Sequence, residues 1–161
     1  MIPVRFVIAV KTPNTLNGSM GTTRGARMAA DGLRRKQRQL GYEHAIESLR
    51  AVGVPTRERW MPARVRKGVV VRPGFSRTVA NVHAHWSVEL VRLSSGQLDE
   101  HDGLRAALKS VVDGIADALD VNDGDRARVT WLPRQRKAPR GVVGVEVQIS
   151  QSNPQHQEHT R

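Results

Sequence analysis

The sequence predicts an α+β fold in which a mixed, mostly antiparallel sheet carries two main helices. Three observations support this class. Apolar and polar residues alternate over residues 78–93, and apolar residues recur at helical spacing over residues 22–53 and again over residues 102–119. We expect one domain over residues 1–150, followed by a disordered tail over residues 151–161, which contains no apolar residue.

The first strand is expected at residues 3–10, a short apolar run with β-branched side chains. A helix should begin at Thr22 or Thr23, either of which can cap its first turn, and run to about Leu40. Gly41 is expected to stop or bend this helix, after which the apolar stripe resumes.

The middle of the chain predicts a linker and two strands. Residues 54–62 contain two prolines and are expected to be a linker, and residues 65–72 are typical of one strand. The alternation over residues 78–93 predicts an antiparallel strand with one buried and one solvated face. The buried face is expected to contain Val82, Ala84, Trp86, Val88 and Leu90.

The second helix is expected to begin at Asp102, which stands in the position of an N-cap. Its apolar stripe consists of Leu104, Leu108, Val111, Val112, Ile115 and Leu119. Residues 120–125 are expected to form a turn-rich connector. Two more strands are predicted at residues 127–132 and 142–149, joined by a basic loop over residues 134–140.

Charge is distributed unevenly along the chain. The net charge is +11, yet eight of the fifteen acidic residues lie between Asp99 and Asp125, where only Arg105 and Lys109 are basic. This segment is therefore −6 and the remainder of the chain is +17. A basic body attracts a polyanion, and clustered carboxylates can bind a divalent metal, so the pattern indicates a metal-dependent enzyme that acts on nucleic acid. A basic structural protein of the ribosomal type is the alternative.

The composition excludes several classes of protein. The chain has no cysteine, which rules out disulfides, thiolate zinc sites and a cysteine nucleophile. No apolar run approaches the ~20 residues of a membrane span, and no signal-peptide pattern precedes Arg5. We therefore expect a cytoplasmic protein that does not contact membranes. No nucleotide-binding glycine motif is present, and no small-molecule cofactor is expected.

Helical spacing places Asp102, Lys109 and Asp113 on one face of the second helix, away from its apolar stripe. At 1.5 Å per residue, the connector lies about 25 Å from Asp102 along the helix axis. Asp123 and Asp125 can therefore reach Asp102 only if the connector or the next strand folds back, or if a second subunit supplies them. The alternative is structural: Asp102 caps the helix, the helix's other aspartates are solvated, and the connector is only a turn.

The stretch LDEHDGLRAALKSVVDGIADALDVNDGD, residues 98–125, resembles the signature of RusA-like Holliday junction resolvases, especially divergent phage forms. Within it, KSVVDGI is similar to the helical part of that signature, and VNDGD is similar to its acidic turn. PNTLN, residues 13–17, is similar to the family's N-terminal loop. Two departures are present. Gly103 stands where the family usually has Asn, and Lys109 follows Asp102 at one helical turn more than in the common form.

The resemblance implies a RusA-like domain that acts as a dimeric endonuclease. It implies that the enzyme uses Mg²⁺, or Mn²⁺ in its place, to cleave Holliday junctions or other branched DNA. The catalytic residues that it implies are Asp102, Lys109 and Asp123, with the lysine near the scissile phosphate. The metal ligands that it implies are Asp99, Asp102, Asp123 and Asp125. A non-catalytic nucleic-acid-binding protein, or a degenerate family member that binds junctions without cutting them, is the alternative.

Two groups of basic residues are expected to contact phosphates. The first group recurs at helical spacing on the first helix and consists of Arg24, Arg27, Arg34, Arg35 and Arg38. The second group lies in the late loop and consists of Arg134, Arg136, Lys137 and Arg140. Because a four-way junction is two-fold symmetric, we expect a homodimer, with an interface that avoids the arginines and uses neutral elements such as residues 78–93.

Overall fold

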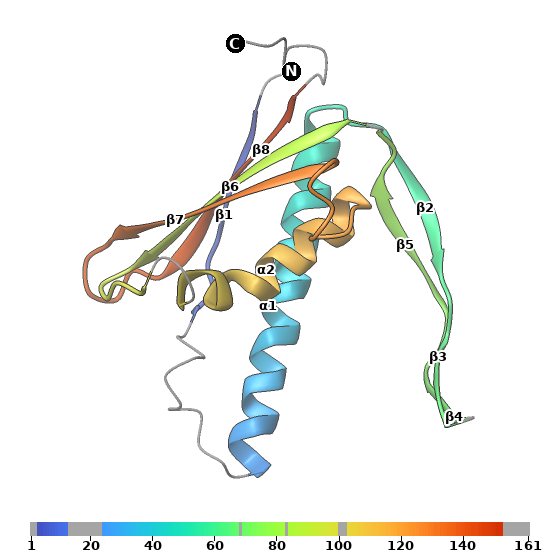
Figure 1. Ribbon diagram of the computed structural model, residues 1–161, viewed down its shortest axis with the longest axis horizontal. Coiled ribbons are helices and arrows are strands. Elements are labelled where there is room, and N and C mark those ends of the chain that lie inside the picture. The colour runs from blue at the N-terminus through green and yellow to red at the C-terminus, as the bar shows by residue number, and fades with distance from the viewer. Residues whose placement is uncertain (1–2, 13–23, 68, 83, 100–102, 153–161) are drawn as a thin grey trace.

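The computed structural model describes residues 3–12, 24–67, 69–82, 84–99 and 103–152. Within these ranges it contains two helices and eight strands, arranged as one four-stranded sheet and two two-stranded ribbons (Figure 1). The helices pack on each other and against one face of the four-stranded sheet. The predicted α+β class, with two helices and a mixed, mostly antiparallel sheet, is confirmed.

The four-stranded sheet has the order β1–β8–β6–β7, with bounds Val4–Ile8, Gly144–Ser152, His85–Ser94 and Val129–Lys137. β8 is antiparallel to both of its neighbours, whereas β6 and β7 are parallel. A parallel pair needs a crossover connection, and α2 (Gly103–Leu119) supplies it. The predicted burial is confirmed in β6, where Trp86, Val88 and Leu90 are fully buried under the helices.

The first helix, α1 (Arg24–Ala51), crosses α2 at two glycines. A Cβ atom on Gly41 would lie 2.8 Å from the carbonyl oxygen of Val111, and a Cβ atom on Gly114 would lie 2.1 Å from that of Arg38. The two helix backbones therefore touch here, and only glycine permits this approach. The prediction that Gly41 would stop or bend the helix is wrong, because this glycine serves the crossing and α1 continues through it.

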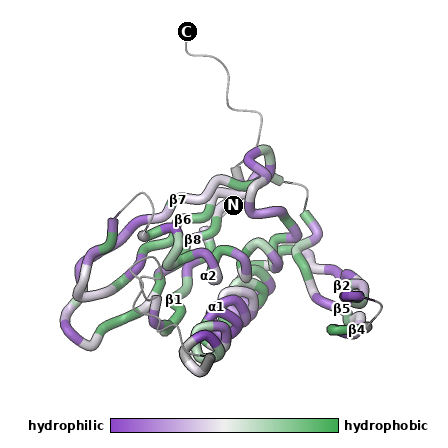
Figure 2. The backbone as a smooth tube through the Cα atoms, turned by 60° about the horizontal axis from the view of Figure 1, so that its bottom comes forward, coloured by the Kyte–Doolittle hydropathy of each residue, from purple (hydrophilic) through white to green (hydrophobic). Residues whose placement is uncertain are grey.

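α1 ends at a glycine. Its predicted caps, Thr22 and Thr23, lie outside the described residues. At the other end, the Val54 N–H donates to the Leu49 carbonyl oxygen at 2.9 Å while Gly53 adopts a φ of 78°. This Schellman-type motif ends the helix at the glycine that the apolar stripe indicated. Polar residues, purple in Figure 2, are prominent along the near end of this helix.

A two-stranded ribbon projects from the body of the protein beside α1 (Figure 1). Its base pairs β2 (Thr56–Met61) with β5 (Phe75–Ala80), and its tip pairs β3 (Arg64–Arg66) with β4 (Val69–Arg72). We call this ribbon, residues 56–80, the arm. Both pairings are antiparallel, so the chain runs out along one strand and returns along the other.

Three predictions are wrong in this region. Residues 54–62 are not a linker, because their two prolines flank β2 and leave its ladder intact. Residues 65–72 form a hairpin rather than one strand, with Lys67 at a φ of 49° in the turn. Residues 78–93 are divided between β5 and β6, although the alternation of the sequence continues through the break. Val82 and Ala84 lie in this break and are half-buried rather than part of the buried face of a strand.

The last two strands also differ from the prediction. β7 continues through Pro133 to Lys137, so most of the predicted basic loop is strand. This is possible because β7 is an edge strand, where a proline need not interrupt the ladder. β8 runs from Gly144 to Ser152 and thus passes the predicted domain end at residue 150, while residues 153–161 lie outside the described ranges.

The helices and β6 bear on two predictions about partners, namely the absence of membrane contact and the position of a dimer interface. Neither α1 nor α2, the helices of the described residues, has the length and apolar character required to cross a membrane. β6, which the sequence offered as a dimer interface, is an interior strand with both edges paired. Only its outer face is accessible, so the expected interface cannot use the edge of this strand.

Gly114→Ala should lower the free energy of unfolding by about 3 kcal/mol, because the added methyl group must push the α1 backbone away. Gly32→Ala is the matched control, since a Cβ atom there meets nothing within 4 Å. It should raise stability by up to ~1 kcal/mol through better helix propensity. Urea unfolding of both variants measures these effects. Equal stabilities for the two variants would contradict a crossing with touching backbones.

Candidate functional site

Lys109 lies on the exposed face of α2 and contacts two aspartates. Its Nζ donates to Oδ2 of Asp123 at 2.8 Å and also donates to Oδ1 of Asp113, one helical turn further on. Asp123 belongs to the connector that follows α2. The connector therefore folds back along the helix, which is one of the two arrangements that the sequence allowed for bringing the late aspartates toward the start of α2.

Turn chemistry at the end of α2 produces this reversal. Asp120 adopts a φ of 55°, and the Val121 N–H donates to the carbonyl oxygen of Ala116 at 3.1 Å. This Schellman-type motif stops the helix and redirects the chain. Oδ1 of Asp125 then accepts a hydrogen bond from the Ala127 N–H at 3.1 Å, so one predicted metal ligand also stabilises the turn before β7.

β7 anchors both ends of the acidic segment. The Trp131 indole N–H donates to the carbonyl oxygen of Asp123 at 2.9 Å. The side-chain amide of Gln135 exchanges two hydrogen bonds with the backbone of Leu98, at 2.9 and 2.7 Å. The two anchoring residues are four positions apart on one face of the strand, about 13 Å along it. Asp99, next to Leu98, and Asp123 are thus held at different points along β7.

The electrostatics of the cluster follow from these contacts. The hydrogen bond from Lys109 lowers the pKa of the Asp123 carboxyl below its usual range, and a weaker effect of burial opposes it. Burial lowers the pKa of Lys109, but its hydrogen bonds to Asp113 and Asp123 outweigh that effect and raise this pKa overall. At neutral pH Lys109 therefore carries its charge and Asp123 is ionised.

A cleft of about 550 Å³ lies beside the cluster, between α2 and β7. Three cations line it, namely Arg105, Lys109 and Arg126, and among the described residues Asp123 is its one acidic lining residue. Trp131 and neighbouring aliphatic side chains supply an apolar wall. A cationic cleft with an apolar wall is suited to an anion that also carries a flat or hydrophobic group.

The predicted metal ligands do not form a cluster within the part of the chain that the structure describes. Among the described residues, no group of three or more His, Asp or Glu side chains is arranged to bind a metal ion. Asp123 pairs with Lys109, Asp125 accepts from a backbone amide, and Asp99 is exposed near the Gln135 anchor. Asp102, predicted both as a ligand and as a catalytic residue, lies outside the described residues. The described carboxylates nearest to Lys109 are those of Asp113 and Asp123, and both are paired with its ammonium group.

Two further aspartates join the arm to α2. Asp117, which is 17% exposed, accepts from Nε of Arg38 and from Nη1 of Arg77, both at 2.7 Å. Asp120 accepts from Nη2 of Arg57 at 2.8 Å and from a second arginine of the same strand. The alternative that regarded the helix aspartates as solvated is therefore wrong for Asp117. These ion pairs hold the arm against α2 and its connector.

The predicted phosphate-contacting residues fall on two surfaces that the fold keeps apart. On α1, Arg27, Arg34 and Arg35 are exposed, Arg34 pairs with Asp31 at 3.3 Å, and the side chain of Arg24 is not described. Arg38 is occupied by Asp117, whose hydrogen bond raises the pKa of this arginine.

The second surface is the face of the sheet opposite the helices. Arg134 pairs with Glu89 at 2.9 Å and Arg136 pairs with Glu146, whereas Lys137 and Arg140 are exposed at the end of β7. Acidic partners therefore reduce the positive potential of this surface. It is a weaker candidate for phosphate contacts than α1.

Sequence reasoning missed the basic residues of the arm. They are Arg57, Arg59, Arg64, Arg66, Lys67, Arg72 and Arg77. A signal for them exists, because arginines at positions 57 and 59, and again at 64 and 66, repeat with the two-residue period of a strand. Positions 57 and 59 fall within the residues predicted as a linker, 54–62, whereas Arg66 falls within the strand predicted at residues 65–72.

No family model, curated protein or solved structure matches this chain. The fold class is therefore established by the structure alone. The similarity of residues 98–125 to RusA-like resolvases is still a hypothesis based on the sequence.

Lys109→Met should return the pKa of the Asp123 carboxyl toward its ordinary value of about 3.9, because the hydrogen bond that lowers it is lost. Titration of the Asp123 carboxyl carbon by NMR measures this change. Lys36→Met, an exposed lysine of α1, is the control and should leave the Asp123 titration unchanged.

The same shift has a consequence for stability. A lowered carboxyl pKa stabilises the folded state above the ordinary pKa and loses this effect as the pH falls through the lowered value. The difference in unfolding free energy between the parent protein and Lys109→Met should therefore be constant near neutrality and shrink below about pH 4. A difference that persists unchanged to lower pH would contradict the ion pair as its source.

Proposed function

We propose that this protein is a metal-dependent, structure-selective endonuclease that cleaves Holliday junctions or other branched DNA in the cytoplasm. Mg²⁺, or Mn²⁺ in its place, is the proposed cofactor. The observation that carries the proposal is the fold-back of the connector, which brings Asp123 within 2.8 Å of Lys109 on α2. A lysine and carboxylates from separate segments thus meet beside a cationic cleft, and this arrangement supports the proposal.

Each side chain has a definite role in this proposal. Asp123 and Asp102 would provide oxygen ligands, with Asp99 and Asp125 as further candidates, and a divalent ion held there would supply an activated water and charge neutralisation. Lys109 places a positive charge where the scissile phosphate would lie, and Asp113 fixes its ammonium group. Arg105 and Arg126 attract the flanking phosphates into the cleft.

A non-catalytic DNA-binding protein is the second candidate, and one observation favours it. The carboxylates of Asp113, Asp117, Asp120 and Asp123 are all paired with lysine or arginine. Paired carboxylates are poorer ligands, because a metal must first displace the cation that neutralises them. In this alternative the acidic segment is a scaffold, and the basic surfaces alone bind DNA.

Asp123→Asn should reduce Mg²⁺-dependent nicking of a four-way junction by about 100-fold or more, as expected for loss of a group that stabilises charge in the transition state. Binding of the junction in EDTA should be unchanged or tighter, because one carboxylate no longer repels phosphate. Glu47→Gln, an exposed carboxylate of α1 that lines neither basic cleft, is the control and should cleave normally. A gel assay with labelled junction measures nicking.

The outcomes separate the two candidates. Full cleavage by Asp123→Asn would remove this residue from the site. Absence of cleavage by the parent protein in both Mg²⁺ and Mn²⁺, together with tight binding in EDTA, would establish the non-catalytic alternative.

The proposed enzyme is a homodimer, because two identical sites match the two-fold symmetry of a junction. Sedimentation at moderate salt should give twice the protomer mass of 17.8 kDa. A protomer mass at every concentration, measured on protein that cleaves junctions, would contradict the dimer.

A further inference from the structure

A second basic cleft lies between α1 and the arm, and its lining shares no residue with that of the cleft beside Lys109. It has a volume of about 550 Å³, and its lining includes five arginines: Arg35, Arg38, Arg64, Arg72 and Arg77. Two of these come from α1 and three from the arm. In Figure 1 the arm extends beside the N-terminal half of α1, so the cleft has a helical wall and a β-ribbon wall.

The positive charge of this cleft is only partly neutralised. Arg38 and Arg77 share the single carboxylate of Asp117. Arg35, Arg64 and Arg72 form no ion pair with any carboxylate among the residues that the structure describes. The cleft therefore carries several more positive charges than negative ones.

The pairing register of β3 and β4 brings two arginines of this cleft together, which destabilises the tip of the arm when no anion is bound. Arg64 of β3 is directly opposite Arg72 of β4. Like charges in directly opposed positions of an antiparallel pair destabilise it. An anion between the two guanidinium groups would remove this repulsion, and arginine is well suited to bind phosphate through two donors at once.

Aromatic contacts place two of the guanidinium groups. Arg72 lies over the ring of Phe75 at 4.2 Å, and Arg77 lies over the ring of Tyr42 at 4.7 Å. Arginine side chains that are already positioned lose less conformational freedom when an anion binds. Two of the cationic side chains of the cleft are therefore already in position before an anion binds.

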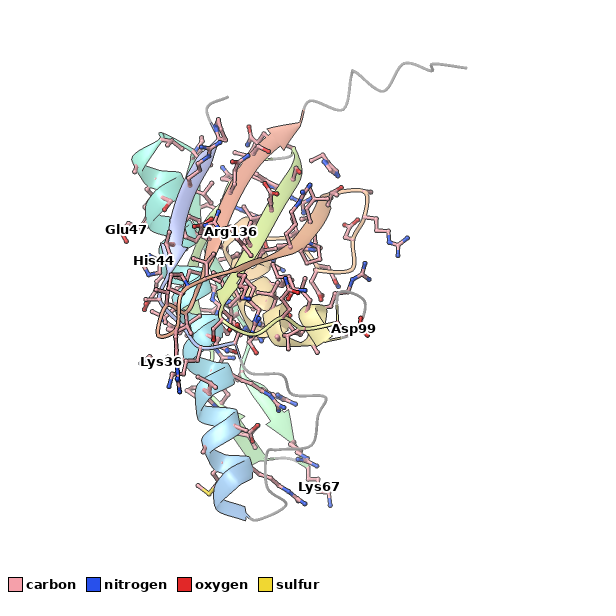
Figure 3. All side chains as sticks on the ribbon, turned by 90° about the vertical axis from the view of Figure 1, so that its left-hand side faces the viewer. Lys36, His44, Glu47, Lys67, Asp99 and Arg136 are labelled. Carbon is pink, nitrogen blue, oxygen red and sulfur yellow. The ribbon has the colours of Figure 1, made fainter. Side chains whose placement is uncertain are left out.

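We propose that this cleft binds the phosphate backbone of duplex DNA. The basic residues extend along both walls, since Arg27 and Arg34 continue the row on α1, and Arg66 and Lys67 continue it to the tip of the arm. Figure 3 shows Lys67 at this tip and Lys36 on the opposite side of α1. A row of charges is complementary to a linear polyanion rather than to a single small anion.

This inference rests on the proposed function only in naming DNA as the polyanion. It requires no metal and no cleavage, because the two residues changed in the test below, Arg64 and Arg72, belong to the arm and not to the Lys109 cluster. The arm would act as a clamp that fixes the duplex against α1, next to the acidic segment that Arg38 contacts through Asp117. An acidic protein is the competing ligand that the experiment must distinguish.

Arg64→Ala/Arg72→Ala is the test variant, and Arg5→Ala/Lys36→Ala is the control with the same loss of charge. Arg5 bonds to Gln148 on the outer face of the sheet, and Lys36 points away from the arm. Binding of a fluorescein-labelled DNA duplex is measured by anisotropy in EDTA over a series of salt concentrations. The test variant should lower the slope of log K against log salt by about 1.8, at 0.9 per phosphate contact, and the control should lower it by much less.

A conservative variant shows whether DNA binding depends on the charge of these two residues or on the paired donors of the guanidinium group. Arg64→Lys/Arg72→Lys keeps the charge and should retain most of the slope with weaker binding, because lysine lacks the paired donors. Thermal unfolding of each variant shows whether the protein is still folded. If the alanine variant is unfolded, the lysine variant alone tests the proposal. DNA binding by the lysine variant equal to that of the parent protein would then overturn the proposal.

Equal slopes for the folded alanine variant and its control would also overturn the proposal and leave an acidic protein as the candidate ligand. These results are independent of catalysis. A protein that never cleaves can still show the loss of slope, and a protein that cleaves normally can still fail to show it. Failure of the cleft is therefore distinguishable from failure of the proposed endonuclease.

Discussion

The close approach of α1 and α2 at Gly41 and Gly114 is the constraint on which the rest of the structure depends. With the backbones in contact, the side chains next to the crossing are brought into reach of one another, and Arg38 of α1 meets Asp117 of α2. Asp117 then reaches Arg77, which positions the arm. Any residue larger than glycine at the crossing would move α2 outward and disturb the arm and the Lys109 cluster together.

The acidic segment acts largely as an internal counter-charge for a basic protein. Asp117 and Asp120 neutralise arginines of α1 and the arm, while Asp113 and Asp123 neutralise Lys109. In sequence the segment resembles a metal-binding cluster, whereas in space its described carboxylates are distributed along α2 and its connector. Both aspartates within α2 itself are ion-paired, Asp113 with Lys109 of the same helix and Asp117 with arginines of α1 and the arm, so the acidic segment is compatible with a stable helix.

The sequence predicted the elements whose burial has a clear period. The stripe of α2 and the buried face of β6 were both correct, because one face of each is covered along its whole length. The outgoing strand of the arm was missed because the arm is mostly exposed: among its described residues only Val79 and Ala80 are buried, too few to generate such a period. The end of β7 was missed because an edge strand tolerates Pro133. At the site, helical spacing placed Lys109 beside Asp113, but the contact with Asp123 depends on the turn at Asp120 and on Trp131, which local patterns cannot reveal.

The tryptophans of this chain give it three built-in optical probes. Trp60 lies on the arm over Gly74 and is 65% exposed, Trp86 is completely buried in the core, and Trp131 is bonded to the connector at Asp123. Their indoles therefore experience solvent, protein interior and the acidic site respectively. Emission from single-tryptophan versions of the protein would follow the arm, the core and the site separately, so the order in which these parts loosen during unfolding is accessible without an attached dye.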